Sequence, residues 1–495
     1  MPETPITQPF DLIVIGGGVN GAGVARDAAG RGASVLLLEK GDLASGTSSK
    51  STKLVHGGLR YLEYYEFALV REALGERETL WSIAPHIIWP MRFVLPVTKS
   101  MRPKWMLRAG LFLYDHIGGK GSLKKTRSVD LRKHRAGGSL EGQYTHAFEY
   151  SDGWVDDARL VVLNALDAAA HGAQIRTRTP VTAARREGDL WHVEAGGETF
   201  HAHALVNAAG PGADDVARLV GENPAYGIRR VRGSHIVVPK LFDHDCAYIL
   251  QQPDTRICFA IPWENDYTLV GTTDADHPGS LDHIKASADE IRYLCDAVNR
   301  YFAADVTPDD VVHTYAGVRA LVDDGSGRPE AASRGYELAL SDQGRGAPVL
   351  GIYGGKITSY RHVAEDALDR LAERLPLLKG KHWTASTPLP GGDFDKQAQP
   401  YLFEVLGEDY PFLSHRDVVR IGRAYGTLAW DWLGDAKSWD HLGRAFGGGL
   451  TLAEVSYLRD REWAQTSEDI LWRRSKLGLH LSATEQGALA EFMGG

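Results

Sequence analysis

The chain has 495 residues, a length that corresponds to roughly two or three domains with ample hydrophobic core. Hydrophobic residues make up 43% and charged residues 24%, which is ordinary for a globular protein, and the net charge of -9 argues against general nucleic-acid binding. The three cysteines, Cys246, Cys258 and Cys295, form no C-x-x-C pair, so the sequence predicts neither a disulfide framework nor a cysteine metal site and suits a reducing cytosol.

The N-terminal stretch predicts a nucleotide-binding βαβ unit. An apolar strand, an amphipathic helix and a second apolar strand follow one another over residues 11–15, 19–31 and 35–38. Gly16, Gly18 and Gly21 have the spacing G-x-G-x-x-G, and Glu39 ends the second strand. Gly16 allows a tight turn, Gly18 the close approach of backbone to a pyrophosphate, and Gly21 the packing of helix on strand. We expect the phosphates at the helix N-terminus and the ribose hydroxyls on Glu39.

A polar loop rich in Ser and Thr, residues 41–53, precedes the sequence His56-Gly57-Gly58-Leu59-Arg60-Tyr61-Leu62. The paired glycines before Arg60 and Tyr61 suggest backbone that passes close to a flat ligand with charged groups beside it. The alternative is a simple junction between a loop and a helix, because a helical pattern follows over residues 65–82.

Residues 152–212 predict the continuation of the nucleotide domain. A helix over residues 156–171 leads to a strand over 174–177 and a meander over 190–195 and 198–202. An apolar strand, 204–206, then runs into the small-residue turn 207–211. We expect this turn to bring backbone against the cofactor a second time.

Residues 228–320 change in character. Short segments separated by turn residues, over 232–239, 247–250, 257–262 and 268–273, predict an antiparallel sheet. One long helix interrupts them, because apolar residues from Ile284 to Phe302 keep a spacing of three and four. We expect a substrate-binding domain inserted into the nucleotide domain.

The chain then returns to the nucleotide domain. A strand over residues 349–353 ends in the turn Gly354-Gly355-Lys356, and Thr358 is the expected N-cap of a helix that runs to about Arg374. A helix N-terminus beside a lysine places positive potential against an electron-rich ligand edge. After a Pro/Gly-rich linker at residues 387–392, helical patterns dominate, and two stretches have capping-box spacing: Thr451–Glu454 and Ser482–Glu485.

Positive charge is concentrated between Lys99 and Arg135, where eleven Lys or Arg stand against two acids. The same segment contains a run of apolar and aromatic residues from Trp105 to Tyr114. Such a segment is typical of docking on anionic lipid headgroups, and the alternative is a solvated basic face over a buried helix. An amphipathic helix over residues 360–375 also suits a membrane surface. The sequence has no run of about eighteen apolar residues and no recognisable secretion signal, so we expect no membrane span.

Several stretches resemble the FAD-dependent glycerol-3-phosphate dehydrogenases of aerobic bacteria. They are DLIVIGGGVNGAGVARDAAGRG, TSSKSTKLVHGGLRYLE, FEYSDGWVDDARL, RGSHIVVP, VGTTD, TYAGVRAL, GGKITSYR and the stretch from Asp469 to Arg474. The resemblance implies an α/β fold with a Rossmann-type FAD-binding domain of the p-hydroxybenzoate hydroxylase or D-amino acid oxidase type. It also implies an inserted antiparallel-sheet substrate domain and an all-helical C-terminal cap. We expect the FAD-binding domain at residues 1–75, 150–215 and 320–385, the substrate domain at 76–149 and 216–319, and the cap at 386–495.

The resemblance also implies a reaction, the oxidation of sn-glycerol 3-phosphate to dihydroxyacetone phosphate by hydride transfer to FAD, with electrons passed to membrane quinone. The family's substrate pocket falls on Arg60, Tyr61, His235, Arg319, Arg334 and Lys356. Arg60, Arg334 and Tyr61 are assigned to the phosphate, because guanidinium groups bind a phosphate dianion bidentately. His235 is the expected base for the hydroxyl proton, with His56 as the alternative. Arg319 and Lys356 are expected to stabilise negative charge on the substrate oxygen and, for Lys356, on the reduced flavin.

The expected FAD contacts come from the glycine turn, the two loops that follow it, and the turns near the ends of later strands. They are Gly16, Gly18, Gly21, Glu39, Ser48, Ser49, His56, Gly57, Gly58, Val181, Gly210, Gly355, Lys356 and Thr358. We expect no metal site.

Other functions stay open from the sequence. A glycerol-3-phosphate oxidase shares the flavin and the substrate but delivers electrons to oxygen, and an amine or amino acid oxidase on the same scaffold is a more distant alternative. A non-catalytic binding protein with a flavoprotein-like fold would keep the glycine turn without using the cofactor. The expected location is the cytoplasm, with peripheral attachment to the inner face of the cell membrane; the alternative is a soluble enzyme with a soluble acceptor. A homodimer is compatible with the sequence.

Overall fold

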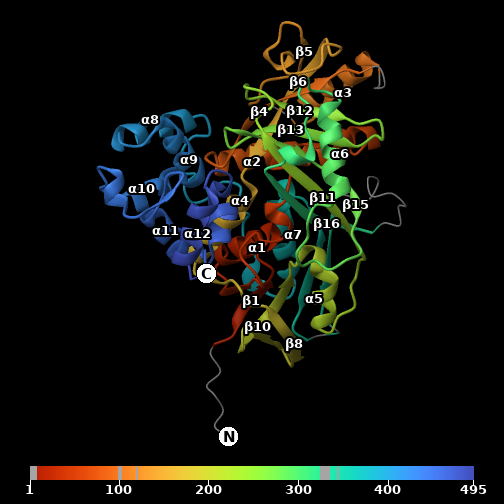
Figure 1. Cartoon of the computed structure of the whole chain (residues 1–495). Coiled ribbons are helices and arrows are strands. Elements are labelled where there is room, and N and C mark those ends of the chain that lie inside the picture. Colours follow the sequence, from red (N-terminus) through yellow and green to blue (C-terminus); the bar gives the residue numbers. More distant parts are fainter. Residues whose placement is uncertain are drawn as a thin grey trace.

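The computed structural model describes residues 8–98, 103–118, 121–323, 335–342, 344 and 346–494. It contains two large β-sheets, and the C-terminal helices lie beside the helices of the first sheet (Figure 1). Both sheets are assembled from segments that lie far apart in the sequence.

The first sheet has the strand order β17-β18-β10-β1-β2-β7, with the β8–β9 hairpin attached to β10. Its central strands run parallel, as the βαβ pattern predicts, and β17 is antiparallel to β18. The strands are β1 (Phe10–Ile15), β2 (Val35–Leu38), β7 (Gln174–Arg176), β8 (Val181–Glu187), β9 (Leu190–Ala195), β10 (Glu198–Asn207), β17 (Tyr336–Ser341) and β18 (Val349–Gly354). Because β1, β10 and β18 are parallel neighbours, the turns that follow them meet at one edge of the sheet.

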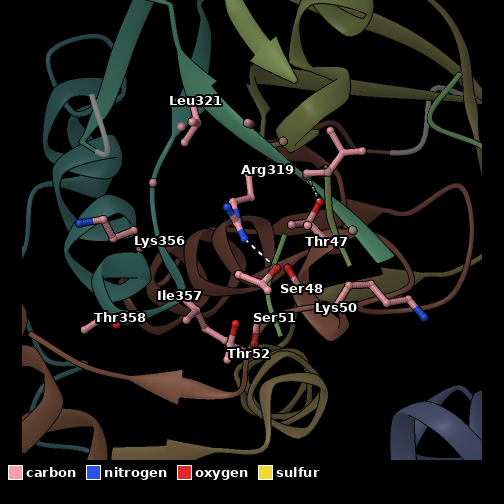
Figure 2. Close-up of a pocket in the computed structure, with 18 of the residues that line it drawn as sticks. Thr47, Ser48, Lys50, Ser51, Thr52, Arg319, Leu321, Lys356, Ile357 and Thr358 are labelled. Carbon is pink, nitrogen blue, oxygen red and sulfur yellow. Dashed lines mark hydrogen bonds between the residues drawn. The ribbon is translucent and has the colours of Figure 1, made fainter. Parts of the chain in front are cut away.

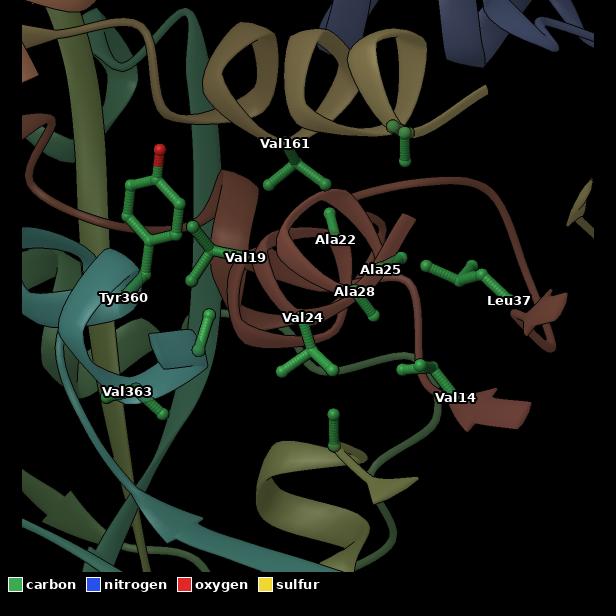
Figure 3. Packing of buried hydrophobic residues seen from close by; sticks show 14 of the residues in the cluster. Val14, Val19, Ala22, Val24, Ala25, Ala28, Leu37, Val161, Tyr360 and Val363 are labelled. Carbon is green, nitrogen blue, oxygen red and sulfur yellow. The ribbon is translucent and has the colours of Figure 1, made fainter. Parts of the chain in front are cut away.

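The helix of the βαβ unit, α1 (Val19–Gly30), is buried between α4 (Asp157–Ala170) and α7 (Tyr360–Leu371). Figure 3 shows Val161 of α4 and Tyr360 and Val363 of α7 on different sides of α1. The helices approach closely because α1 is rich in Gly and Ala. A Cβ at Gly23 would lie only 2.8 Å from the Tyr360 ring. Removal of this apolar surface from water stabilises the packing of these helices on the first sheet.

The second sheet has the order β15-β11-β14-β13-β12-β4-β6-β3, with β16 paired to β11 and β5 to β6. Its pairs are antiparallel as predicted, except that β12 runs parallel to β4. The strands are β3 (Leu54–Val55), β4 (Ile88–Pro96), β5 (Arg127–Asp130), β6 (His146–Val155), β11 (Ile228–Pro239), β12 (Ala247–Gln251), β13 (Ile257–Trp263), β14 (Tyr267–Gly271), β15 (Ala275–Asp276) and β16 (His313–Val322). The helix α6 (Ala288–Asn299) packs on this sheet and begins at a Ser287–Glu290 capping box.

The remaining helices flank the sheets or form the C-terminal part. They are α2 (Phe67–Ile83), α3 (Lys104–Ile117), α5 (Ala213–Leu219), α8 (Gln399–Asp409), α9 (His415–Tyr425), α10 (Ala429–Leu433), α11 (Leu452–Glu462) and α12 (Ala483–Phe492). The C-terminal part has a hydrophobic core of its own. It also contains a small hairpin of β19 (Ala445–Gly447) and β20 (Leu450–Thr451) and the π-helix η10 (Asp469–Arg474), so it is helical but not entirely so.

Some local predictions are wrong. The segments expected at 198–202 and 204–206 form one continuous strand, β10. The helix expected from Ile284 begins only at Ala288. Thr358 lies in the short 3-10 helix η6 (Ile357–Ser359) and does not cap α7. Ser482 and Glu485 form the predicted capping box, whereas Glu454 instead accepts hydrogen bonds from Arg420 and Tyr425.

The helix predicted over residues 360–375 does not offer a membrane surface. The apolar residues of α7 are buried against α1 and the first sheet: Tyr360, Val363, Ala364, Ala367, Leu368 and Leu371. The amphipathic pattern was correct, but the protein's own core covers its apolar face. Within the described ranges, the structure contains no helix that is both long and apolar enough to span a bilayer. The division into three domains stays a prediction.

Candidate functional site

A cavity of about 1850 Å³ is lined by residues of both sheets. One end is formed by the glycine turn after β1 and by the turns after β10 and β18. The other end is formed by β11, β13 and β16 of the second sheet and by α3. The loop after β2 supplies one wall, over residues 45–48 and 50–52. The cavity therefore joins the predicted nucleotide site to the predicted substrate sheet.

The glycine turn has the conformation that its spacing predicts. Gly16 has φ +117°, and a Cβ there would lie 2.6 Å from the Ala208 carbonyl oxygen. A Cβ at Gly21 would overlap the Gly16 carbonyl, so Gly21 lies under the turn and not on the cavity surface. Gly18 is the N-cap of α1 and lines the cavity. A ligand phosphate at this point meets the N-terminus of α1, where backbone N–H groups and the helix dipole favour negative charge.

Glu39 lines the cavity and also shapes its floor. Its carboxylate accepts the N–H of Gly17 at 2.6 Å and the N–H of Gly41 at 2.7 Å. Burial raises the pKa of Glu39, while these two backbone donors lower it. Glu39 thus fixes the turn on which a ribose would rest, in addition to offering it an acceptor.

The loop after β2 presents hydroxyl groups to the cavity. Figure 2 shows Arg319 between this loop, with Ser48 and Thr52 labelled, and the segment from Lys356 to Thr358. Ser48 Oγ accepts the Val19 N–H at 3.0 Å and so links the loop to the start of α1. Ser49, a predicted FAD contact, does not line this cavity; it borders a neighbouring cavity of about 360 Å³.

The two glycines after His56 have different roles. The Gly58 N–H donates to His56 Nδ1 at 2.9 Å, and Gly58 has φ +72°. The Gly57 N–H donates to the Tyr114 hydroxyl at 2.8 Å, and Gly57 is absent from the cavity lining while His56 and Gly58 belong to it. The His56 N–H donates to Thr358 Oγ1 at 3.4 Å. This turn therefore contacts the turn after β18, as expected of two segments around one ligand.

His235 lies on β11 at the substrate end of the cavity and is only 1% exposed. Its ring stacks on Tyr315 at a centroid distance of 4.7 Å and lies over Gly271, where a side chain would collide with it. Its Nε2 is 3.0 Å from Thr52 Oγ1. Burial, together with the positive charges of Arg319 and Lys53, lowers the pKa of His235 well below its usual value, so the ring is neutral at pH 7.

Arg319 lies on β16, the strand that pairs with β11. Its guanidinium forms an ion pair with Asp274 and donates to Thr272 Oγ1 at 3.1 Å. A Cβ at Gly233 would lie 2.6 Å from Arg319 Nη2, so the glycine gives this side chain its room. These contacts hold the Arg319 side chain in one orientation, in which it lines the cavity.

Lys356 and Tyr61 both line the cavity, although they lie far apart in the sequence. The Lys356 ammonium lies 3.9 Å from the centroid of the Tyr61 ring, which is a cation–π contact. Arg60 belongs to the 3-10 helix η2 (Leu59–Tyr64), and its side chain lies outside the described part of the structure. Arg334 lies outside the described residues altogether.

Most predicted FAD contacts meet around the cavity. Besides those already placed, Val181, Gly210 and Gly355 belong to its lining. Asn20, at the start of α1, also lines it, and its Oδ1 is buried without a hydrogen-bond partner among the described residues. A buried amide oxygen normally has a partner, so a ligand donor fits here. The glycine turn, the helix N-terminus and this amide suit a dinucleotide such as FAD.

Three residues that contact the predicted site residues had no predicted role, namely Thr52, Asp274 and Tyr315. All three belong to stretches that carry the family resemblance but had no assigned role: Asp274 ends VGTTD, Tyr315 is in TYAGVRAL, and Thr52 is in TSSKSTKLVHGGLRYLE. Thr52 is one of several hydroxyl residues in a polar loop, and nothing in that composition distinguishes it. Only the folded chain pairs it with His235, which is 183 positions later.

Known proteins are similar to this chain over most of its length. Residues 11–361 match a family model described as FAD dependent oxidoreductase. D-erythritol 1-phosphate dehydrogenase of Brucella abortus is 52% identical over 498 residues, which covers 99% of this chain and 98% of the relative. Glycerol-3-phosphate dehydrogenase of Pseudomonas aeruginosa is 48% identical over 501 residues, which covers 99% of this chain and 96% of the relative.

Among solved structures, the glycerol-3-phosphate dehydrogenase from Bacillus halodurans complexed with FAD is 25% identical, with a TM-score of 0.76. The alignment covers 98% of this chain and 94% of that one. The predicted fold class and the predicted cofactor, FAD, are confirmed. The chain belongs to the FAD-dependent oxidoreductase family, in the group that includes the glycerol-3-phosphate dehydrogenases.

Proposed function

We propose that this protein oxidises sn-glycerol 3-phosphate to dihydroxyacetone phosphate. The observation that carries the proposal is that His235, Arg319, Tyr61 and Lys356 line the cavity that begins at the glycine turn. A neutral imidazole, a fixed guanidinium and an ammonium group suit the loss of a proton and a hydride from a secondary alcohol. Bound FAD supplies the hydride acceptor.

We assign the hydroxyl proton to His235. The ring is neutral at pH 7 because burial lowers its pKa, so one of its two nitrogens carries a lone pair that can accept the proton. His56 is the weaker alternative, because its Nδ1 already accepts the Gly58 N–H. Thr52 lies on the cavity surface and contacts His235 Nε2, so its hydroxyl either orients the ring or passes the proton to it.

The positive groups have separate tasks in this proposal. Arg319, oriented by Asp274 and Thr272, stabilises negative charge on the substrate oxygen as its proton leaves. Lys356 stabilises negative charge on the flavin side of the cavity. Arg60, Arg334 and Tyr61 bind the phosphate, because two guanidinium groups and a hydroxyl match its oxygens.

The test is anaerobic bleaching of the bound flavin. Glycerol 3-phosphate is expected to reduce the flavin rapidly, whereas glycerol and lactate, which lack the phosphate, are expected to leave it oxidised. Equal reduction by glycerol would show that no phosphate is recognised, and a chain purified without flavin would support the non-catalytic alternative.

A second substrate has its own support. The relative at 52% identity over nearly the whole chain is named for D-erythritol 1-phosphate, a phosphorylated alcohol with one carbon more. The same four cavity residues suit either compound, because both carry a phosphate and a secondary hydroxyl. The ratio of kcat/KM for the two substrates decides between them.

We further propose that the electrons pass to membrane quinone and that the protein binds the inner face of the cell membrane from the cytoplasm. The support is α3, which exposes Trp105 and Phe112 at 69% and 64% although both are large apolar side chains. Tyr65 and Phe67, on the segment that packs against α3, are also exposed. Met106, Leu107 and Leu113 of α3 line the cavity, so this surface borders the site. Lysine and arginine residues flank it in the sequence.

Vesicle binding tests the membrane proposal. The double variant Trp105→Ser/Phe112→Ser is expected to bind phosphatidylglycerol vesicles at least about tenfold more weakly, because each buried aromatic ring contributes roughly 1.5–3 kcal/mol. Tyr401→Ser is the matched control, since Tyr401 on α8 is 67% exposed and distant in the sequence. Unchanged binding of the double variant would overturn the proposal.

Peroxide formation from oxygen at the rate of quinone reduction would favour the oxidase alternative.

A further inference from the structure

We propose that the C-terminal helical part holds the polar loop after β2 (residues 41–53) in place over FAD. We call this contact the clamp, and Asp42, Arg473 and Arg474 are its positioning residues. The inference rests on FAD as the cofactor and not on the identity of the substrate. Loss of the clamp and failure of the proposed reaction are therefore distinguishable, because cofactor binding is measured without any substrate.

The clamp is a carboxylate gripped by two consecutive arginines. Arg473 Nε donates to Asp42 Oδ2 at 2.5 Å, and Arg474 donates from Nη1 at 2.6 Å and from Nη2 to Oδ1 at 2.8 Å. All three side chains are buried. The two arginines lie more than four hundred positions after Asp42, so the contact exists only once the C-terminal part has docked. Buried and bidentate charge pairs have a fixed geometry, unlike exposed ones.

The arginines are themselves fixed from the C-terminal side. Arg474 also donates to the Glu462 carbonyl at 2.6 Å, and Arg473 forms ion pairs with Glu468 and Asp469. Both belong to the π-helix η10, which ends where the Ser475 N–H donates to the Ile470 carbonyl at 2.9 Å. π-Helical turns are rare overall, but those that occur are often found at functional sites.

A second contact ties the same π-helix to the base of the loop. Asp469 accepts Arg178 Nη2 at 2.8 Å, and the Arg178 N–H donates to the Gly41 carbonyl at 2.8 Å. Gly41 in turn donates its N–H to Glu39, the carboxylate that shapes the glycine turn. One end of the loop is therefore connected to η10 by two contacts, one through Asp42 and one through Gly41.

The other end of the loop, after Asp42, forms part of the cavity wall. Residues 45–48 and 50–52 line the cavity, Ser48 bonds to the first turn of α1, and Thr52 contacts His235. The Ser51 hydroxyl donates to Asp157 at 2.7 Å. Beside Asp42, the Ala44 N–H donates to the Gly17 carbonyl at 3.0 Å, whereas the hydrogen bonds to the Asp42 carboxylate itself come from the two arginines. Releasing Asp42 is expected to loosen the loop over FAD while the two sheets stay folded.

FAD affinity of the full-length protein tests the clamp. Arg474→Gln and Asp42→Asn are each expected to raise the dissociation constant of FAD, measured by fluorescence on the apoprotein, by roughly ten- to a hundredfold. The double variant is expected to bind FAD no more weakly than Asp42→Asn alone, because that change already removes the contact with Arg474. Additive losses would show that Arg474 and Asp42 act separately and would overturn the proposal.

The control is Arg416→Gln. This variant breaks an exposed ion pair of 2.6 Å between Arg416 of the C-terminal part and Asp266 in the turn between β13 and β14. Neither residue belongs to the loop after β2. It is expected to leave FAD affinity within about twofold of wild type, since exposed pairs contribute little.

Urea unfolding separates a clamp from a merely structural contact. A variant whose urea midpoint falls while the FAD dissociation constant is unchanged would contradict the proposal. If the Arg474→Gln apoprotein is unfolded by circular dichroism, Arg474→Lys replaces it, and the rate of FAD release from the holoprotein is measured. Faster release supports the clamp, and release at the wild-type rate overturns it.

Discussion

Thr52 Oγ1 lies 3.0 Å from Nε2 of His235, and this contact joins the loop after β2 to the strand β11 of the other sheet. His235 is almost completely buried, whereas Thr52 is partly exposed to the cavity. The hydroxyl is therefore placed between the solvent-accessible space and the proposed base. The proposed proton transfer therefore needs both sheets in place.

Replacing Thr52 by Val tests the contact. Valine keeps the shape of threonine but leaves a buried ring nitrogen without its partner, so flavin reduction by glycerol 3-phosphate is expected to slow about tenfold in anaerobic rapid mixing. The pH profile is expected to shift as well, which a change of packing alone would not cause. Thr52→Ser keeps the hydroxyl and is the control. If serine and valine behave alike, the hydroxyl has no role.

Replacing His235 by Asn tests the base itself. We expect the rate of flavin reduction to fall by about 10² to 10⁴, with little change in bound FAD. In the wild-type protein, burial lowers the pKa of His235, so the acid limb of the kcat/KM profile is expected below pH 6.5. An acid limb that persists unchanged in the Asn variant would assign it to another group, with His56→Asn as the next variant to measure.

Replacing Asp274 by Asn tests the orientation of Arg319. The ion pair and the Thr272 contact hold the guanidinium at the cavity, and loss of the carboxylate is expected to lower kcat/KM by roughly 10- to 100-fold. The mutation leaves the hydrogen bonds from Arg319 to Thr272 Oγ1 and to the Thr273 carbonyl in place, so FAD absorbance should be unaffected. Asp276→Asn is the matched control, because Asp276 forms a more exposed pair with Arg229 on the neighbouring strand. Equal effects of both changes would remove the special role of Asp274.

The nucleotide domain was predictable because its signals are local. The glycines, the apolar strands and Glu39 lie within thirty residues, and the structure places them as the spacing indicates. The strands of the second sheet were also recognisable, since turn residues separate them. By contrast, the sequence around Ala202 and Ala204 did not reveal one long strand, because β10 changes partner there: β9 pairs with residues 198–202 and β1 with the part from Ala202 onward.

The site was predictable only as a set of residue types. His235, Arg319 and Lys356 came from a resemblance, and the fold brings them to one cavity. Their supports, Thr52 and Asp274, are ordinary polar residues until long-range pairing gives them partners. The membrane assignment of residues 360–375 failed for a related reason: an amphipathic pattern does not say whether lipid, another helix or the protein core covers its apolar face.

Acid is expected to destabilise the protein through His86, a fully buried residue at the junction between α2 and β4. Burial lowers its pKa to about 3, with a further contribution from the Arg159 charge. Among the described residues, neither ring nitrogen has a hydrogen-bond partner, so no nearby acceptor stabilises the charged form. The unfolded chain takes up a proton below about pH 6.5, whereas the folded protein does not until about pH 3. Stability is therefore unaffected above pH 6.5 and is lost progressively between these two values.

Urea unfolding of the holoprotein at a series of pH values measures this loss. One buried histidine contributes up to about 1.4 kcal/mol per pH unit to the slope of the unfolding free energy. His86→Phe keeps an aromatic ring without a titratable group, so the slope between pH 6.5 and 5 is expected to decrease even if repacking changes the stability at pH 7. His203→Gln, at an exposed position of β10, is expected to leave the slope unchanged. A His86→Phe variant with the wild-type slope would show that the ring is protonated in the folded protein, because only then does its removal leave the proton uptake on unfolding unaltered.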